Sequence, residues 1–270
     1  MELGDLRIDP VVDGVGRFAP TLTFGGTSED DWSVHQDLLD QDGLLEFVMG
    51  GFLVRGLGRT TLVDLGLGVG TMMGITAGSF MDNLAALGVT ADEITDVVFT
   101  HLHVDHIGWA VTDGRPTFAN ATYRCSQADV DYFIRDAMAR PAEQATLAII
   151  GAHIEAWAKG STTNLVPGID QFAAPGHTPG SSVIVLSSQE QRALLLGDVV
   201  HCPVQLLDEE WAGLFDVDPE LARRTRTALS RELEGDPTLM AGAHFPGLRF
   251  GRLIAGTGRR NWTVPSLNLP

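Results

Sequence analysis

Four side chains that can bind a metal ion lie within six positions of one short segment, THLHVDHIG at residues 100–108. On an extended chain, side chains two residues apart point to the same side, so His101 and His103 can share one ion. Asp105 and His106 are adjacent and diverge, unless a turn aims both at a second ion close by. Three histidines and an aspartate at this spacing have no common explanation in core packing. The segment therefore predicts a metal site that suits two ions better than one.

Three further candidate ligands follow glycine or apolar residues, as is typical of loops at strand ends: His177 in PGHTPG, Asp198 in LLGD and His244 in AGAH. Taken alone, each is typical of a partly buried histidine or of a turn or cap residue. Beside the segment 100–108 they become candidate ligands, because imidazole and carboxylate groups bind zinc and other first-row divalent ions. Seven ligands over two ions about 3.5 to 4 Å apart would leave an open position for water.

The elements expected around these loops mix strands with helices. Apolar runs bounded by glycines predict a strand hairpin over residues 44–67 and strands over 96–100, 121–125, 182–186, 193–196 and 238–242. Helices are predicted over 71–87, 127–140, 142–158 and 219–233. Thr90 is predicted to cap a single helical turn, with Glu93 completing a capping box. The mixture indicates an α/β or α+β class and, without a linker or repeat, a single domain over residues 1–270.

Composition narrows the function classes further. The chain has 270 residues, 44% of them hydrophobic, which is enough to bury a sizeable core. No apolar run of about 18 or more residues and no basic, apolar leader is present, so we expect a soluble, cytoplasmic protein. Cys125 and Cys202 match neither a disulfide framework nor a CxxC pair and are expected to be reduced thiols. A net charge of -17 disfavours nucleic acid or an anionic membrane and favours a small neutral substrate.

Together, the strings THLHVDHIG, PGHTPGS, GDVVH and AGAHFP resemble the metallo-β-lactamase superfamily, whose ligand pattern is HxHxDH followed by separate His, Asp and His residues. The resemblance runs from Leu62 to His244. Within it, the string LVDLG places Asp64 where the family has a strand-end aspartate that supports the metal loops. The resemblance implies a four-layer αββα sandwich with the metal site at one edge, between the two sheets.

The same resemblance implies how the ligands divide between two divalent ions, for which zinc is expected first and manganese, iron or cobalt are alternatives. The first ion would be held by His101, His103 and His177, the second by Asp105, His106 and His244, and Asp198 would bridge them. A hydroxide between the ions would then attack the substrate.

Within the superfamily, the ligand set and GDVVH followed by PVQ look closest to acyl-homoserine-lactone lactonases and methyl-parathion-type hydrolases. We therefore expect a hydrolase that cleaves a neutral lactone, ester or phosphotriester. Two alternatives stay open: an iron-dependent oxidoreductase similar to sulfur dioxygenases, and a thioester hydrolase similar to glyoxalase II. Related enzymes are often dimers, so a homodimer is the candidate assembly.

Three residues are candidates for roles around the metals. The resemblance implies that Asp105 could pass a proton to the leaving alkoxide. His201 falls where the lactonases carry a tyrosine that contacts a substrate oxygen; it could take that role, support a metal ligand or lie on the surface. Trp109 is a candidate wall of the substrate pocket, with plain core packing as its alternative. Further candidates for pocket aromatics are Phe24, Phe80, Phe133, Trp157 and Trp211.

Overall fold

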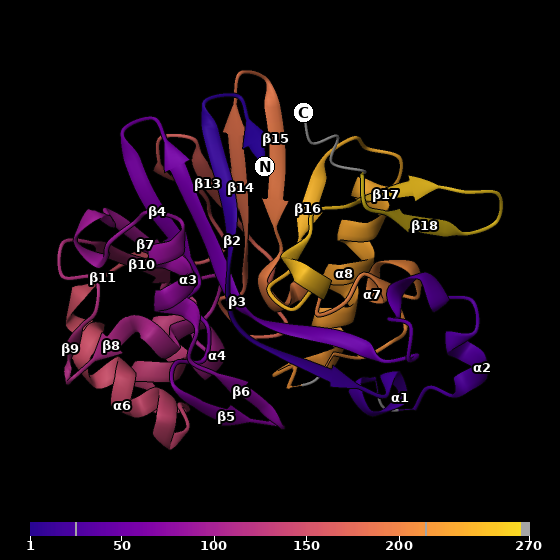
Figure 1. The fold of residues 1–270 in the computed structure, drawn as a ribbon, viewed down its shortest axis with the longest axis horizontal. Helices are drawn as coiled ribbons and strands as arrows, with labels where there is room; N and C mark the ends of the chain where they lie inside the picture. The colour runs from indigo at the N-terminus through magenta and orange to yellow at the C-terminus, as the bar shows by residue number, and fades with distance from the viewer. Residues whose placement is uncertain (25, 214, 266–270) are drawn as a thin grey trace.

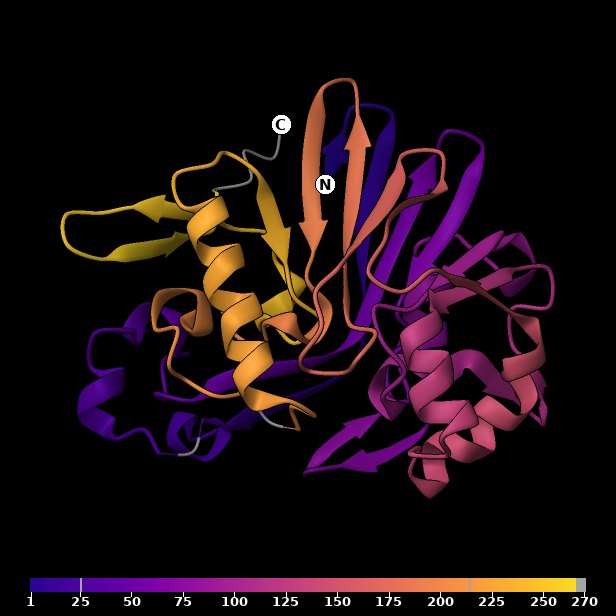
Figure 2. The same ribbon diagram turned by 180° about the vertical axis from the view of Figure 1, so that it is seen from behind.

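The computed structural model describes residues 1–24, 26–213 and 215–265. Two β-sheets lie face to face in the middle of the molecule, and helices cover the outer side of each (Figure 1). The view from behind shows the same layers, with α6 outside one sheet and α8 outside the other (Figure 2). This arrangement confirms the predicted αββα sandwich of mixed α and β class.

The first sheet has nine strands in the order β11-β10-β7-β4-β3-β2-β6-β5, with β1 beside β2. They are β1 (Glu2–Leu3), β2 (Leu6–Phe18), β3 (Leu45–Gly56), β4 (Arg59–Val63), β5 (Gly70–Met72), β6 (Ile75–Ala77), β7 (Asp96–Val98), β10 (Thr122–Ser126) and β11 (Ile154–Trp157). The long strands β2 and β3 pair antiparallel, whereas β4, β7, β10 and β11 run parallel. All three residues of β7 are buried, as expected for a parallel strand covered on both faces.

The second sheet has five strands in the order β12-β13-β14-β15-β16. They are β12 (Thr162–Val166), β13 (Ile169–Ala173), β14 (Ser182–Ser188), β15 (Gln191–Leu195) and β16 (Leu239–Ala241). Side chains alternate between its two faces, because successive residues of a strand point to opposite sides. Ile184 and Leu195 pack with the first sheet, while Val183 and Leu194 pack on the other side against Leu229 of α8.

Three main helices form the outer layers. Phe80 and Leu84 of α3 (Phe80–Ala86) and Leu147 of α6 (Pro141–Ile150) are buried in the core cluster of the first sheet. Outside the second sheet lies α8 (Pro219–Leu233), which begins as predicted: the Asp218 side chain accepts a hydrogen bond from the Leu221 N–H at 3.0 Å. Beside it lies α7 (Val204–Leu207).

Short turns and two small hairpins complete the described chain. The helical turns are α1 (Pro20–Thr23), α2 (Glu29–Trp32), η1 (Gln36–Leu38), η2 (Ala91–Glu93), α4 (Val104–Ile107), η3 (Gly108–Ala110), α5 (Gln127–Asp129), η4 (Val130–Arg135), η5 (Gly151–His153), η6 (Gly197–Val199) and η7 (Pro246–Leu248). The hairpins are β8 (Val111–Thr112) with β9 (Arg115–Pro116), and β17 (Arg252–Ala255) with β18 (Arg260–Thr263). The predicted capping box is present, with the Thr90 N–H donating to Glu93 Oε2 at 2.8 Å.

Three of the predicted helices were wrong in part. The helical stretch predicted over 127–140 ends at Arg135. Residues 70–77 form the hairpin of β5 and β6, and the helix starts only at Phe80, because Gly74 and Gly78 adopt positive φ angles of 83° and 143°. The helix predicted over 142–158 ends at Ile150, and residues 154–157 instead extend the first sheet as β11, paired with β10. The long strand β2 was not predicted; Pro10, Asp13 and two glycines interrupt its apolar pattern.

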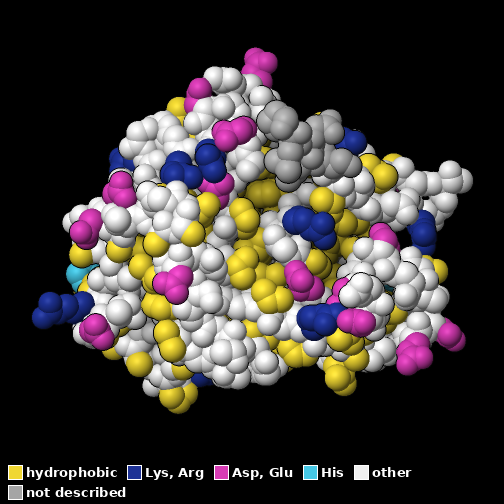
Figure 3. All heavy atoms as spheres, viewed as in Figure 1, with side chains coloured by type: hydrophobic (Ala, Val, Ile, Leu, Met, Phe, Trp, Pro, Cys, Tyr) yellow, Lys and Arg dark blue, Asp and Glu magenta, His cyan; other side chains and the backbone are white. Residues whose placement is uncertain are grey.

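The surface carries both signs of charge. On the face in Figure 3, Asp and Glu side chains are spread out, with Lys and Arg side chains scattered between them rather than gathered in one basic patch. Among the described residues, no helix has the length and apolar character that crossing a membrane requires.

Candidate metal centre

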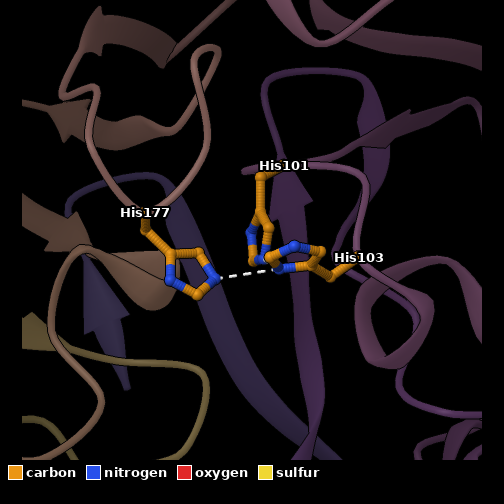
Figure 4. Close-up of side chains that lie close together, drawn as sticks. All are labelled: His101, His103 and His177. Atoms are coloured by element: carbon orange, nitrogen blue, oxygen red, sulfur yellow. Dashed lines mark hydrogen bonds between the residues drawn. The ribbon is translucent and has the colours of Figure 1, made fainter. Parts of the chain in front are cut away.

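Three histidines converge at the strand ends of the two sheets. His101 and His103 follow β7 on an extended stretch, and His177 comes from the loop between β13 and β14 (Figure 4). His103 Nδ1 lies 3.1 Å from His101 Nε2 and 2.9 Å from His177 Nε2. Three imidazole nitrogens this close together, all buried, form a group that can hold one metal ion.

A second group forms beside the first because the chain turns directly after His103. The short helix α4 carries Asp105 and His106, and its turn brings both toward His244 at the end of β16. His244 Nε2 lies 3.6 Å from Asp105 Oδ2 and 3.1 Å from Asp198 Oδ1. Asp198 also approaches the first group, with 3.4 Å between its Oδ2 and His177 Nε2. The structure thus brings together the seven residues proposed as ligands, with Asp198 between the two groups.

Two buried polar atoms test whether these residues fit a metal ion. His106 Nε2 and Asp198 Oδ1 lie 3.2 Å apart, yet neither has a hydrogen-bond partner among the described residues. An unpaired buried polar atom costs about 1 to 3 kcal/mol, so native proteins rarely leave one. A cation held between the nitrogen and the oxygen would satisfy both atoms. The residues present therefore fit a metal site.

Burial sets the protonation state of the first group. It lowers the pKa of His101 well below the ordinary value and, together with the nearby His177, lowers the pKa of His103 to about 2. Burial also lowers the pKa of His177, although Asp216 acts in the opposite direction. All three rings are therefore neutral near pH 7, and the neutral imidazole is the form that binds a metal ion.

Charge pairing dominates in the second group. Burial alone would lower the pKa of His106 and His244, but Asp198, joined by Asp64 at His106 and by Asp105 at His244, outweighs burial and raises the pKa of both rings. Burial acts to raise the pKa of Asp198, and the facing imidazoles, His244 first, still hold that pKa well below its usual range. Asp198 is therefore ionised at the point where positive charge would be held.

Hydrogen-bonding groups on the far side of three rings, those of His101, His106 and His244, fix the direction in which these rings point. Asp64 Oδ2 lies 2.9 Å from His106 Nδ1, in the supporting position expected for this aspartate. The main-chain oxygen of Val48 lies 2.7 Å from His244 Nδ1, and Thr100 Oγ1 lies 3.1 Å from His101 Nδ1. Such contacts select the tautomer that presents the other ring nitrogen to a metal.

Two supporting carboxylates escaped the sequence prediction. Asp216 Oδ1 lies 3.0 Å from His177 Nδ1, while its other oxygen accepts a hydrogen bond from buried Arg226 at 3.2 Å. Asp129 accepts hydrogen bonds from Leu102 N–H at 3.1 Å and Thr178 Oγ1–H at 3.0 Å. Asp129 therefore ties the loop of His101 and His103 to the loop of His177. Neither carboxylate has a sequence neighbour that signals its role.

His201 lies inside the site rather than on the surface. Its side chain is buried, with Nε2 at 3.3 Å from Asp198 Oδ2. Its ring stacks at 5.8 Å on that of His244 and meets that of His177 edge-on at 4.9 Å. The neighbouring Cys202 is buried in a separate apolar cluster, and burial raises the pKa of its thiol to about 12, so it is inert.

A cavity of about 420 Å³ opens onto these groups. One side is polar and consists of His103, Asp105, His177, Asp198, His201 and His244. The opposite walls are mostly apolar: Phe18, Leu22, Phe47, Met49, Met72, Met73, Ile75, Val104 and Phe215, with Thr23, Arg140 and Glu143 between them. The site is thus a small polar floor under an apolar chamber, the usual form of a small-molecule site.

Trp109 is not among the described residues that line this cavity, and its predicted place in the pocket wall is corrected. Its indole N–H instead donates a hydrogen bond to Asp13 at 2.9 Å. The other predicted candidates, Phe24, Phe80, Phe133, Trp157 and Trp211, also lie outside the lining. The aromatic walls come from Phe18, Phe47 and Phe215, and no local motif marks these residues in the sequence.

An αββα fold with histidine and aspartate side chains gathered at the ends of its strands is typical of a class of metal-binding proteins. The sequence matches the metallo-beta-lactamase superfamily over residues 51–244, and the chain belongs to that family. The predicted family is therefore confirmed. No curated protein sequence matches the chain.

Several solved structures share the fold. AidC, described as a dizinc quorum-quenching lactonase in complex with a product, is 22% identical over 99% of this chain and 97% of its own, with a TM-score of 0.86. The hydrolase AbOPH is 24% identical over 98% and 96%, with a TM-score of 0.84. A mutant of AiiA from B. thuringiensis, with N-decanoyl-L-homoserine bound, is 18% identical over 90% and 94%, with a TM-score of 0.64.

Proposed function

We propose that the protein is a metal-dependent hydrolase that cleaves a neutral lactone, ester or phosphotriester with two divalent ions, zinc first among them. The observation that carries this proposal is the cavity, which joins a floor of ligand-type side chains to apolar walls. Such a site can bind the apolar part of a substrate and leave its polar, scissile group beside the metals.

In this proposal the ligands divide as the two groups suggest. His101, His103 and His177 hold one ion, and Asp105, His106 and His244 hold the other. Asp198 contacts both because its oxygens lie within 3.4 Å of His177 on one side and 3.1 Å of His244 on the other. A shared carboxylate would reduce the repulsion between two cations at such close range.

Two bound divalent ions would supply a hydroxide at neutral pH and polarise the oxygen of the scissile group. The chain's own residues do the rest. Asp105 lines the cavity with a side chain that is 13% exposed, so one of its oxygens can hold or release a proton at the leaving oxygen. His201 lines the same floor, and a ring N–H there can donate to an oxygen that gains negative charge.

The composition of the walls supports a neutral substrate. Arg140 is the only cation among the described lining residues, and it lies over the ring of Phe215 at 5.2 Å, close to Glu143. Away from the proposed metal ions, a strongly anionic substrate would find little positive charge in the walls to offset the net charge of -17. The similar folds of a lactonase and of the hydrolase AbOPH add support for hydrolysis, and the first of them adds support for a lactone.

Elemental analysis together with a substrate panel tests the proposal. Protein purified without chelator should contain about two divalent ions per chain, and should hydrolyse an acyl lactone, an aryl ester or a phosphotriester in a way that a chelator abolishes. A metal content near zero, even after incubation with zinc, manganese or cobalt, would contradict the proposal. Iron with oxygen consumption on a sulfur compound would instead favour the oxidoreductase alternative.

A further inference from the structure

One buried carboxylate outside the metal centre collects an unusual number of hydrogen bonds. Asp13 is 1% exposed and sits where the pairing of β2 with β3 shifts register, between Val12 and Gly14. A bulge of this kind re-aims a side chain and is frequent near active sites. The five N–H groups that donate to Asp13 Oδ1 and Oδ2, at 2.8 to 3.0 Å, belong to Leu67, Gly68, Gly78, Phe80 and the indole of Trp109.

These donors come from three segments that meet around the Asp13 carboxylate. Leu67 and Gly68 precede the hairpin of β5 and β6, and Gly78 and Phe80 follow it. Trp109 follows the segment that carries the predicted ligands Asp105 and His106. The main-chain oxygen of Asp13 also accepts hydrogen bonds from the N–H groups of residues 78 and 79, at 3.2 and 3.1 Å. One residue therefore clamps both ends of the hairpin and joins them to the metal loop.

The loop beneath the clamp is packed without spare room. A Cβ atom on Gly108 would lie 1.9 Å from the carbonyl carbon of Leu67, and one on Gly66 would lie 2.6 Å from Asp13 Oδ2. The Gly108 N–H donates to the oxygen of Gly66 at 2.8 Å. A shift of the Asp13 carboxylate would therefore be transmitted to the backbone on both sides.

The clamped hairpin carries part of the substrate cavity. Met72, Met73 and Ile75 all line the apolar wall, and Met73 is 54% exposed. The backbone ladder holds the hairpin at one point, because β6 pairs with β2 through Gly14 and Ala77, and the buried side chain of Ile75 packs beside Gly16. In Figure 1 the hairpin projects from the lower edge of the first sheet. Its position over the metal centre thus depends on how its two ends are held.

We propose that Asp13 is a positioning residue that holds the β5–β6 hairpin, and with it the apolar wall of the cavity, over the metal centre. This inference rests on the proposed function for its effect on hydrolysis. Without the clamp the wall moves away from the part of the substrate that lies farthest from the scissile bond. A long acyl chain would lose contacts, whereas a short one, held near the metals, would not.

Asp13→Asn tests the clamp, because it keeps the shape of the side chain and replaces one acceptor oxygen with an amide NH2 group, itself a donor, that faces N–H donors. Hydrolysis of p-nitrophenyl acetate and p-nitrophenyl octanoate would be compared at full metal content. We expect the KM for the octanoate to rise by at least about tenfold, the loss expected for about two methylene contacts. The KM for the acetate and both kcat values should stay within about threefold.

Two further variants separate positioning from general stability. Asp9→Asn alters another carboxylate of β2, one bound to Arg7 and Arg55 and not to the hairpin, and serves as the matched control with no change in KM for either ester. Trp109→Phe removes a single donor from Asp13 and should shift the octanoate KM in the same direction by less. If Asp13→Asn does not fold, the KM values of Trp109→Phe for the two esters are compared with those of the parent instead.

Hydrogen exchange gives a readout that needs no turnover. Amides of residues 70–78 should exchange at least about tenfold faster in Asp13→Asn, while those of β3 and β4 stay protected. Unchanged exchange in the hairpin would show that Asp13 does not hold it. An equal rise in KM for both esters would show that Asp13 does not affect the preference for long acyl chains. If the parent protein hydrolyses neither ester, the proposed function fails on these substrates, and the exchange experiment still decides whether Asp13 holds the hairpin.

Discussion

Removal of His201 is the sharpest test of how the floor of the cavity works. Its Nε2 lies 3.3 Å from Asp198 Oδ2 in a side chain that is 5% exposed, so a hydrogen bond made there is poorly screened by water. A donor aimed at the charge that develops in a transition state is worth about 2.7 to 4 kcal/mol. Because His201 Nδ1 has no partner among the described residues, the ring is held less firmly than those of the predicted ligands. We therefore expect His201→Ala to lower kcat/KM by at least about tenfold, or about 1.4 kcal/mol.

The assay combines steady-state kinetics on the best lactone or ester with metal analysis of the same samples. Metal content should stay unchanged, and His201→Tyr should recover part of the loss, since a phenol can also donate to an oxygen. His35→Ala is the matched control, because His35 is equally buried but pairs with Asp208, 2.6 Å away and outside the cavity. If kcat/KM of the alanine variant lies within about twofold of that of the parent, His201 does not contact the transition state. Loss of a metal ion would instead make His201 a ligand.

Three further outcomes follow from the same geometry. Asp198→Asn should reduce bound metal below two ions per chain and hydrolysis to background, and near-normal turnover with full metal content would exclude a shared ligand there. Asp216→Asn should weaken metal binding about 10- to 100-fold in a competition with a chelator, because the neutral amide orients His177 less strongly. In native protein at pH 8, Cys202 and Cys125 should resist alkylation, because both are buried and burial raises the pKa of the Cys202 thiol to about 12. Both thiols should react in urea. Rapid labelling without denaturant would contradict this prediction.

The parts of the fold that local sequence encodes were predicted well. Helix α8 has the predicted bounds because Asp218 and Pro219 mark its first turn and its apolar residues recur at helical spacing. The segment 70–77 was predicted as helix because its apolar residues fit both the helical and the strand repeat. Its strand structure depends on pairing with β2, which lies far away in sequence. Strand β2 was missed for a related reason: Asp13 and Gly14 look like loop residues, and only the bulge explains them.

The candidate ligands and the residues that support them differ in how they can be found. A metal site restricts its ligands to a few residue types and, at residues 101–106, to one short stretch, so the pattern is visible without a structure. A supporting residue need only place a hydrogen-bond acceptor at the right point, so its type and its sequence position are little restricted. Here each lies far along the chain from its partner: Asp216 is 39 residues from His177, Asp129 is 49 from Thr178, and Asp13 is 96 from Trp109. An isolated aspartate more often marks a turn or a helix cap. The candidate metal ligands can thus be predicted from the sequence, whereas the carboxylates that hold their loops in place can be identified only in the folded chain.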